Sequence, residues 1–94
     1  MQVSFSGAPD DGRAHHAIGR LKVAGRWRAA NEAGDEADRR AVLRALMREA
    51  EDYGADALID VTFEIEEVAA GDIDGVPLRR VVAAGSAVHT AAAA

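Results

Sequence analysis

The segment EDYGADALIDVTFEI (residues 51–65) changes its hydrophobic period at a single glycine. Upstream of Gly54, apolar residues recur at intervals of three and four, as on one face of a helix. From Ala57 onwards, apolar and polar residues alternate, as in a strand with one buried face. Helices often end on a left-handed residue, a conformation that glycine adopts more easily than other residues. The sequence therefore predicts a helix that ends at Gly54 and turns directly into a strand.

The predicted helix covers residues 35–53. Acidic residues crowd its beginning, where the helix dipole favours negative charge, and Gly34 or Asp35 suits the N-cap position. Its apolar side is expected to pack on a sheet, because an amphipathic helix must bury its stripe against another element. The stripe consists of Val42, Leu43, Leu46, Met47, Ala50 and Tyr53.

Three strands are expected to form that sheet. Residues 17–27 alternate between apolar and mostly basic side chains, and residues 57–66 between apolar and mostly acidic ones. In residues 78–90 both faces are apolar or small, which is typical of a central strand. Residues 2–6 allow a further short edge strand, and residues 69–77 fit a hairpin loop because they are rich in glycine and aspartate.

We therefore expect one domain, residues 1–94, of the α+β class with the order β-α-β-β. One helix would cover one face of a three-stranded mixed sheet whose last strand is central. The other face and both outer strands would stay exposed. Because one helix is narrower than three strands, copies of the chain are expected to complete the cover over Leu21, Val61 and Val81.

Charge is distributed unevenly along the chain, whose net charge is −5. Residues 1–30 hold five basic and two acidic residues, whereas residues 31–94 hold six basic and fourteen acidic ones. The acidic total argues against a nucleic-acid partner. Opposite charges on the two outer strands favour a head-to-tail contact between copies, which closes into a ring when the rotation between copies divides the circle. An ordinary solvated face is the alternative. The interface candidates are Arg20 and Lys22 on one strand and Asp60, Glu64 and Glu66 on another.

Composition excludes several classes of protein. Cysteine is absent, so there is no disulfide, no thiolate nucleophile and no soft metal site. No run of about 18 apolar residues predicts a membrane span, and the first residues lack the pattern of a signal peptide. We expect a cytoplasmic protein without a membrane partner.

Three stretches resemble the YbjQ-like family of small bacterial proteins, some of which are described as heavy-metal-binding. They are MQVSFSGAPDDG at the start, YGADALIDVTFEI in the middle and VPLRRVVAAGSAV near the end. The resemblance implies a dodecin-like two-layer subunit and a ring, most often a homopentamer, but no established activity. Residues 28–34 are shorter than the glycine-containing insertion that the family has there.

Three histidines are the metal-ligand candidates. His15 and His16 are adjacent, so on a strand they point to opposite faces. Antiparallel pairing of the last strand with the first would bring His89 near one of them. No carboxylate at ligand spacing accompanies them, which favours surface histidines without a metal. No other cofactor is expected.

The sequence gives less support to a catalytic site than to a metal site. Ser86 lies among small residues and no base accompanies it. Residues 71–75 lack the acids of a calcium loop, and Trp27 and Tyr53 suit core or interface anchors better than ligand platforms. The expected function is a non-enzymatic ring-forming module that holds a small ligand or metal ion between subunits. The alternative is an enzyme whose site is shared between subunits and uses Asp60, Glu64, Arg79 and Arg80.

Overall fold

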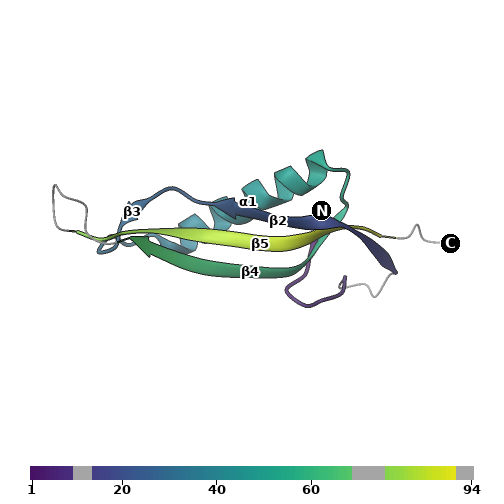
Figure 1. The fold of residues 1–94 in the computed structure, drawn as a ribbon, viewed down its shortest axis with the longest axis horizontal. Helices are drawn as coiled ribbons and strands as arrows, with labels where there is room; N and C mark the ends of the chain where they lie inside the picture. Colours follow the sequence, from purple (N-terminus) through teal and green to yellow (C-terminus); the bar gives the residue numbers. More distant parts are fainter. Residues whose placement is uncertain (10–13, 69–75, 91–94) are drawn as a thin grey trace.

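The computed structural model describes residues 1–9, 14–68 and 76–90. In chain order the described elements are β1 (Gln2–Val3), β2 (His15–Ala24), β3 (Arg28–Ala29), α1 (Asp35–Asp52), β4 (Ala57–Val68) and β5 (Leu78–Thr90). The strands form one mixed sheet with the order β1-β4-β5-β2, and β3 also pairs with β5. Figure 1 shows β5 between β4 and β2. The α+β class, with a single helix among the described residues, is confirmed. The described part of the sheet has five strands instead of three, because two strands of two residues each lie beside the long ones.

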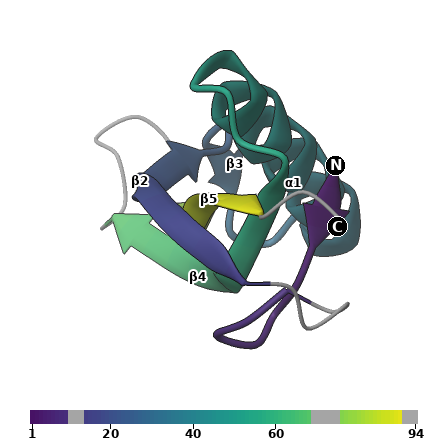
Figure 2. The same cartoon turned by 90° about the vertical axis from the view of Figure 1, so that its right-hand side faces the viewer.

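Strand β5 is central, as its sequence predicts. It pairs antiparallel with β4 on one side and with β2 on the other. Strands β2 and β4 therefore run in the same direction, and α1 lies between them in the chain. Viewed along the strands, α1 covers one side of the sheet (Figure 2).

The ends of α1 agree with the prediction. Gly34 is the N-cap residue and has a φ of 143°. Gly54 follows the C-cap Tyr53 and has a φ of 83°. The N–H of Ala55 donates to the carbonyl of Ala50 at 3.0 Å, which closes the last turn before the chain enters β4. The helix-to-strand corner at Gly54 is confirmed.

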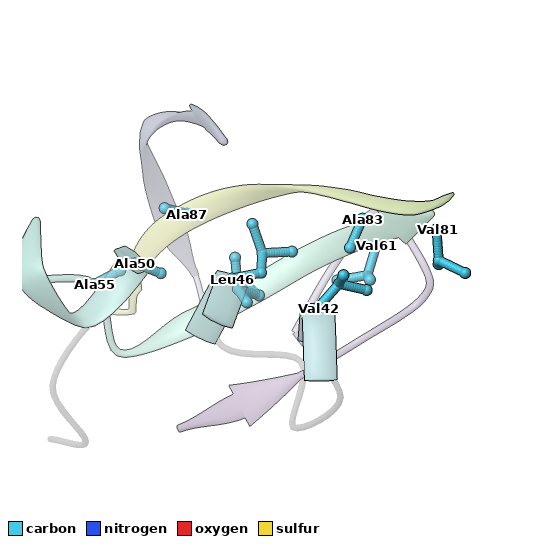
Figure 3. Packing of buried hydrophobic residues seen from close by; sticks show 9 residues of the cluster. Val42, Leu46, Ala50, Ala55, Val61, Val81, Ala83 and Ala87 are labelled. Atoms are coloured by element: carbon cyan, nitrogen blue, oxygen red, sulfur yellow. The ribbon is translucent and has the colours of Figure 1, made fainter. Parts of the chain in front are cut away.

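The core lies between α1 and the sheet (Figure 3). Leu46 is fully buried, and β5 places no side chain beneath it because residue 85 is glycine. A Cβ at Gly85 would lie 3.1 Å from Cγ2 of Val61 and 3.5 Å from Cδ2 of Leu46. The glycine therefore lets the helix approach the sheet closely. The buried cluster consists of Val42, Leu46, Ala50, Ala55, Leu58, Val61, Val81, Ala83 and Ala87.

The expectation that copies must cover this face was wrong for its centre. Val61 and Val81 are only 3% and 2% exposed within one chain, and Leu21 packs partly buried against the same cluster. Helix α1 is shorter than the sheet and therefore covers only part of its length. Its 18 residues span about 27 Å, whereas the 13 residues of β5 span about 43 Å.

A bulge at Asp60 reverses the faces of β4. Asp60 has a φ of 53°, and the register with β5 shifts between Ile59 and Thr62. Two residues of β4 thus oppose one of β5, which moves every later side chain to the other face. The expected single apolar face of residues 57–65 was therefore wrong: Leu58, Val61 and Phe63 lie with the helical cluster, and Ala57 and Ile59 join Val88 in a second cluster.

Candidate functional site

Charged side chains cross the sheet face that α1 does not cover. Nη1 of Arg20 on β2 lies 3.5 Å from Oδ2 of Asp60 on β4. Nζ of Lys22 lies 4.0 Å from Oε2 of Glu66. Small residues of β5 separate the partners, since Ser86 is the register partner of Arg20 and Ala84 that of Lys22. These exposed pairs stabilise the fold little.

This pairing bears on the interface residues suggested by the sequence. Arg20, Lys22, Asp60 and Glu66 all have oppositely charged partners within their own chain. Glu64 has no ion pair among the residues that the structure describes. The basic and acidic outer strands therefore neutralise each other in part across β5. Glu64 is the one of the five candidates without a charged partner among the described residues.

Arg80 links the aromatic and the acidic parts of the same face. Its Nε donates to Oε1 of Glu66 at 2.7 Å, and its guanidinium carbon lies 4.4 Å from the centre of the Trp27 ring. Trp27 and Tyr53 are 40% and 60% exposed, so neither is a core anchor. Trp27 also lies beyond the end of β2, which stops at Ala24.

The residues of the alternative enzyme site do not converge in one chain. Arg79 and Arg80 are neighbours on β5, so their side chains leave opposite faces of the sheet. Nη2 of Arg79 lies 2.7 Å from Oδ1 of Asp35 at the start of α1 and donates to the carbonyl of Glu32 at 2.9 Å. Arg80 and Asp60 lie on the face away from α1, where Asp60 contacts Arg20.

The three histidines lie on two faces of the sheet, because successive side chains of a strand point to opposite faces. His16 is the register partner of His89, whereas His15 is opposite Thr90. The ring centroids of His16 and His89 lie 5.2 Å apart with an interplanar angle of 64°. The structure thus brings two of the three candidate ligands together and leaves His15 on the other face.

Asp56 is a third member of this group that the sequence analysis missed. Its carboxylate accepts hydrogen bonds from the backbone N–H of Thr90 at 2.9 Å and from its hydroxyl at 2.8 Å. Oδ2 of Asp56 also lies 3.6 Å from Nδ1 of His89. The two bonds from Thr90 lower the pKa of Asp56, with a smaller contribution from His89. The register of β4 and β5 predicts this contact. Ala57 pairs with Val88, so Asp56 and His89, one residue further along the two antiparallel strands, lie next to each other.

The donor chemistry fits only some metals. No set of three or more histidine, cysteine, aspartate and glutamate side chains is grouped for an ion within residues 1–9, 14–68 and 76–90. Without cysteine the chain offers no thiolate to a thiophilic heavy metal. A pair of imidazoles suits divalent copper, nickel or zinc, and supplies two of the four positions that a tetrahedral ion needs.

Comparison with known proteins places the chain. Residues 12–91 match the family model YbjQ_1, whose description is "Putative heavy-metal-binding". The chain belongs to this family. The match confirms the YbjQ-like resemblance seen in the sequence, and the family description names a property without naming residues. Among curated proteins, nothing matched.

A solved structure supports the fold of this YbjQ-like chain. It is a protein of unknown function from Pediococcus pentosaceus, described as a member of the DUF74 family. The two superpose with a TM-score of 0.69, and the match covers 97% of this chain and 98% of the other. At 12% identity the likeness concerns the fold alone. In the described part of the chain, no helix has the length and apolarity needed to cross a bilayer.

Proposed function

We propose that this YbjQ-like chain is a non-enzymatic module that joins copies of itself edge to edge into a closed ring of five. The ring would hold small ligands or divalent cations at its subunit junctions. The observation that carries the proposal is that, among the described residues, no strand lies beside the outer edge of β2 or beside the later half of β4. Neither a nucleic acid nor a membrane is part of this role.

The first open edge belongs to β2. The N–H of Gly25 donates to the carbonyl of Val81 at 2.7 Å, which fixes the residues that face β5. Along an antiparallel strand, backbone N–H groups point alternately toward the partner strand and away from it. The N–H groups of Val23 and Leu21 therefore point toward β5, and the N–H of Lys22 between them points outwards. Strand β2 has ten residues and, in the described structure, pairs with β5 alone. The unpaired N–H and C=O groups along an edge of this length can form hydrogen bonds with a strand of another chain.

The second open edge is the later half of β4. Residues 2–6 line its first half, where the N–H of Ser4 donates to Leu58 and that of Asp60 donates to Ser6. From Thr62 to Val68, the described residues provide no strand on that side. Ile65 and Val68 are 43% and 44% exposed there, and Ile18 on β2 is 41% exposed. Burying such apolar side chains would favour association.

The two edges differ, and this favours a ring over a two-fold dimer. Strands β2 and β4 run in the same direction, so β2 of one copy placed beside β4 of the next continues the sheet with a parallel pair. A contact between two different surfaces repeats until the rotation closes. The number five comes from the family resemblance of the sequence.

One pair of variants tests edge pairing directly. Lys22→Pro removes an outward N–H and leaves the bonds between β2 and β5 intact, because proline is tolerated where the N–H faces away from the sheet. Lys22→Ala removes the same charge and keeps the N–H. We expect analytical ultracentrifugation to show a smaller species for Lys22→Pro and an unchanged assembly for Lys22→Ala. Equal assembly of both variants would refute pairing through this edge.

The composite enzyme is less favoured. Its four residues lie on two faces of the sheet, and each of Asp60, Arg79 and Arg80 already contacts a charged partner within the chain. A neighbour would have to break those contacts to build a site.

A further inference from the structure

His16 and His89 form an exposed pair of imidazoles beyond the region that α1 covers. They come from β2 and β5 and face each other in the strand register. The side chain of His89 is 53% exposed, and His16 is exposed as well. Both rings can therefore turn without displacing a packed group, and an ion can reach them from solvent.

The separation of the rings suits one shared ion. A metal–nitrogen distance of about 2.0–2.1 Å places an imidazole centroid about 3.2 Å from the metal. Two such rings at the tetrahedral angle have centroids about 5.2 Å apart. The observed centroid distance is 5.2 Å. The register that places His16 opposite His89 thus brings the two rings to the spacing of a two-imidazole site.

Asp56 lies beside His89 on the Nδ1 side of its ring. Its Oδ2 is 3.6 Å from Nδ1, so a small turn of the ring would bring the two atoms within hydrogen-bond distance and leave Nε2 for an ion. The carboxylate is itself held by the N–H and the hydroxyl of Thr90. A carboxylate behind a ligating histidine orients the ring and makes it a better donor.

We propose that His16 and His89 bind one divalent transition-metal ion of the imidazole-preferring kind, with Asp56 as the residue that positions His89. Copper is the strongest binder of this class, and water would complete the coordination. The site lies within one chain, so it stands whether or not the ring forms. The family description names heavy metals but no ligand, and the donors here select against thiophilic ions.

The test uses Cu²⁺ with the untagged protein and four variants. Isothermal titration should give one ion per chain, and electron paramagnetic resonance should show two imidazole nitrogens. His16→Ala and His89→Ala should each abolish the two-nitrogen spectrum and weaken binding at least tenfold. His15→Ala is the matched control, because this neighbouring histidine lies opposite Thr90; it should bind as the unmodified chain does.

Asp56→Asn separates positioning from ligation. It should weaken Cu²⁺ binding by about tenfold while the spectrum keeps two nitrogens. Circular dichroism of each variant checks that the fold is retained. The proposal is overturned if His15→Ala weakens binding as much as His16→Ala, or if His89→Ala binds as tightly as the unmodified chain.

Discussion

Arg28 donates two hydrogen bonds of 2.7 Å to the carboxylate of Asp38, one from Nε and one from Nη2. The side chains are only 15% and 13% exposed. The bond from Arg28 holds the pKa of Asp38 below its ordinary value, and the same contact raises the pKa of Arg28. The pair ties β3 to the first turn of α1, where no side chain caps the helix.

Breaking this pair should destabilise the chain more than breaking an exposed one. Arg28→Gln leaves a mostly buried carboxylate without its cation, which is costly. Arg40→Gln is the control, because Arg40 bonds Glu36 on the helix surface at 2.8 Å and such pairs contribute about 0.2–0.5 kcal/mol. Thermal unfolding should show a clearly lower midpoint for Arg28→Gln. Equal midpoints would show that the buried pair does not anchor the helix.

Acid should destabilise the fold through Asp38 and Asp56. Both have pKa values lowered from 3.8 in the folded chain, so the unfolded chain binds more protons in acid. Their contribution is complete above pH of about 4 and is lost as the pH falls through the folded pKa values. We expect Asp56→Asn to flatten the dependence of unfolding free energy on pH between about 2 and 5. A slope identical to that of the unmodified chain would contradict the contribution of Asp56.

The contact of α1 with the sheet should depend strongly on Leu46. This side chain is fully buried and lies over Gly85. Leu46→Ala should lower the unfolding free energy by about 2–5 kcal/mol, measured by urea denaturation. Leu43→Ala, at a partly buried position of the same helix, should cost less. The reverse order would mean that the helix packs through a different face.

Glu64 tests whether charge contributes to the contact between copies. It is exposed on β4 and has no ion-pair partner among the described residues. If Arg20 of a neighbour approaches it, Glu64→Lys should weaken assembly, and added salt should weaken assembly of the unmodified chain. Glu51→Lys, an exposed change on α1, is the control. Assembly that ignores both changes would leave backbone pairing and apolar contact as its basis.

The features best predicted from the sequence are those that depend on a single residue or on a long hydrophobic pattern. Gly34 and Gly54 mark the ends of α1 because their backbones lie at positive φ, and the small residues of β5 mark a central strand. The bulge escaped prediction. Leu58 is the one apolar residue on the otherwise polar side of the alternation in residues 57–66, and this does not reveal the φ of 53° at Asp60. Strands β1 and β3 are too short to show a period.

Predicting the candidate site requires the register between strands more than any sequence motif. The alternation of strands predicts that only one of His15 and His16 can face His89, but choosing His16 requires the pairing of β2 with β5. Asp56 and the Arg28–Asp38 pair join residues that no spacing rule connects. Long-range contacts of this kind follow from the folded backbone, so a single sequence does not display them.

Native mass spectrometry of the untagged protein tests the central proposal, assembly through the open edges, most directly. We expect one dominant species of five chains, which Lys22→Pro converts to smaller species and Lys22→Ala leaves intact. A monomer at the concentrations that the cell maintains, unaffected by either substitution, would contradict it.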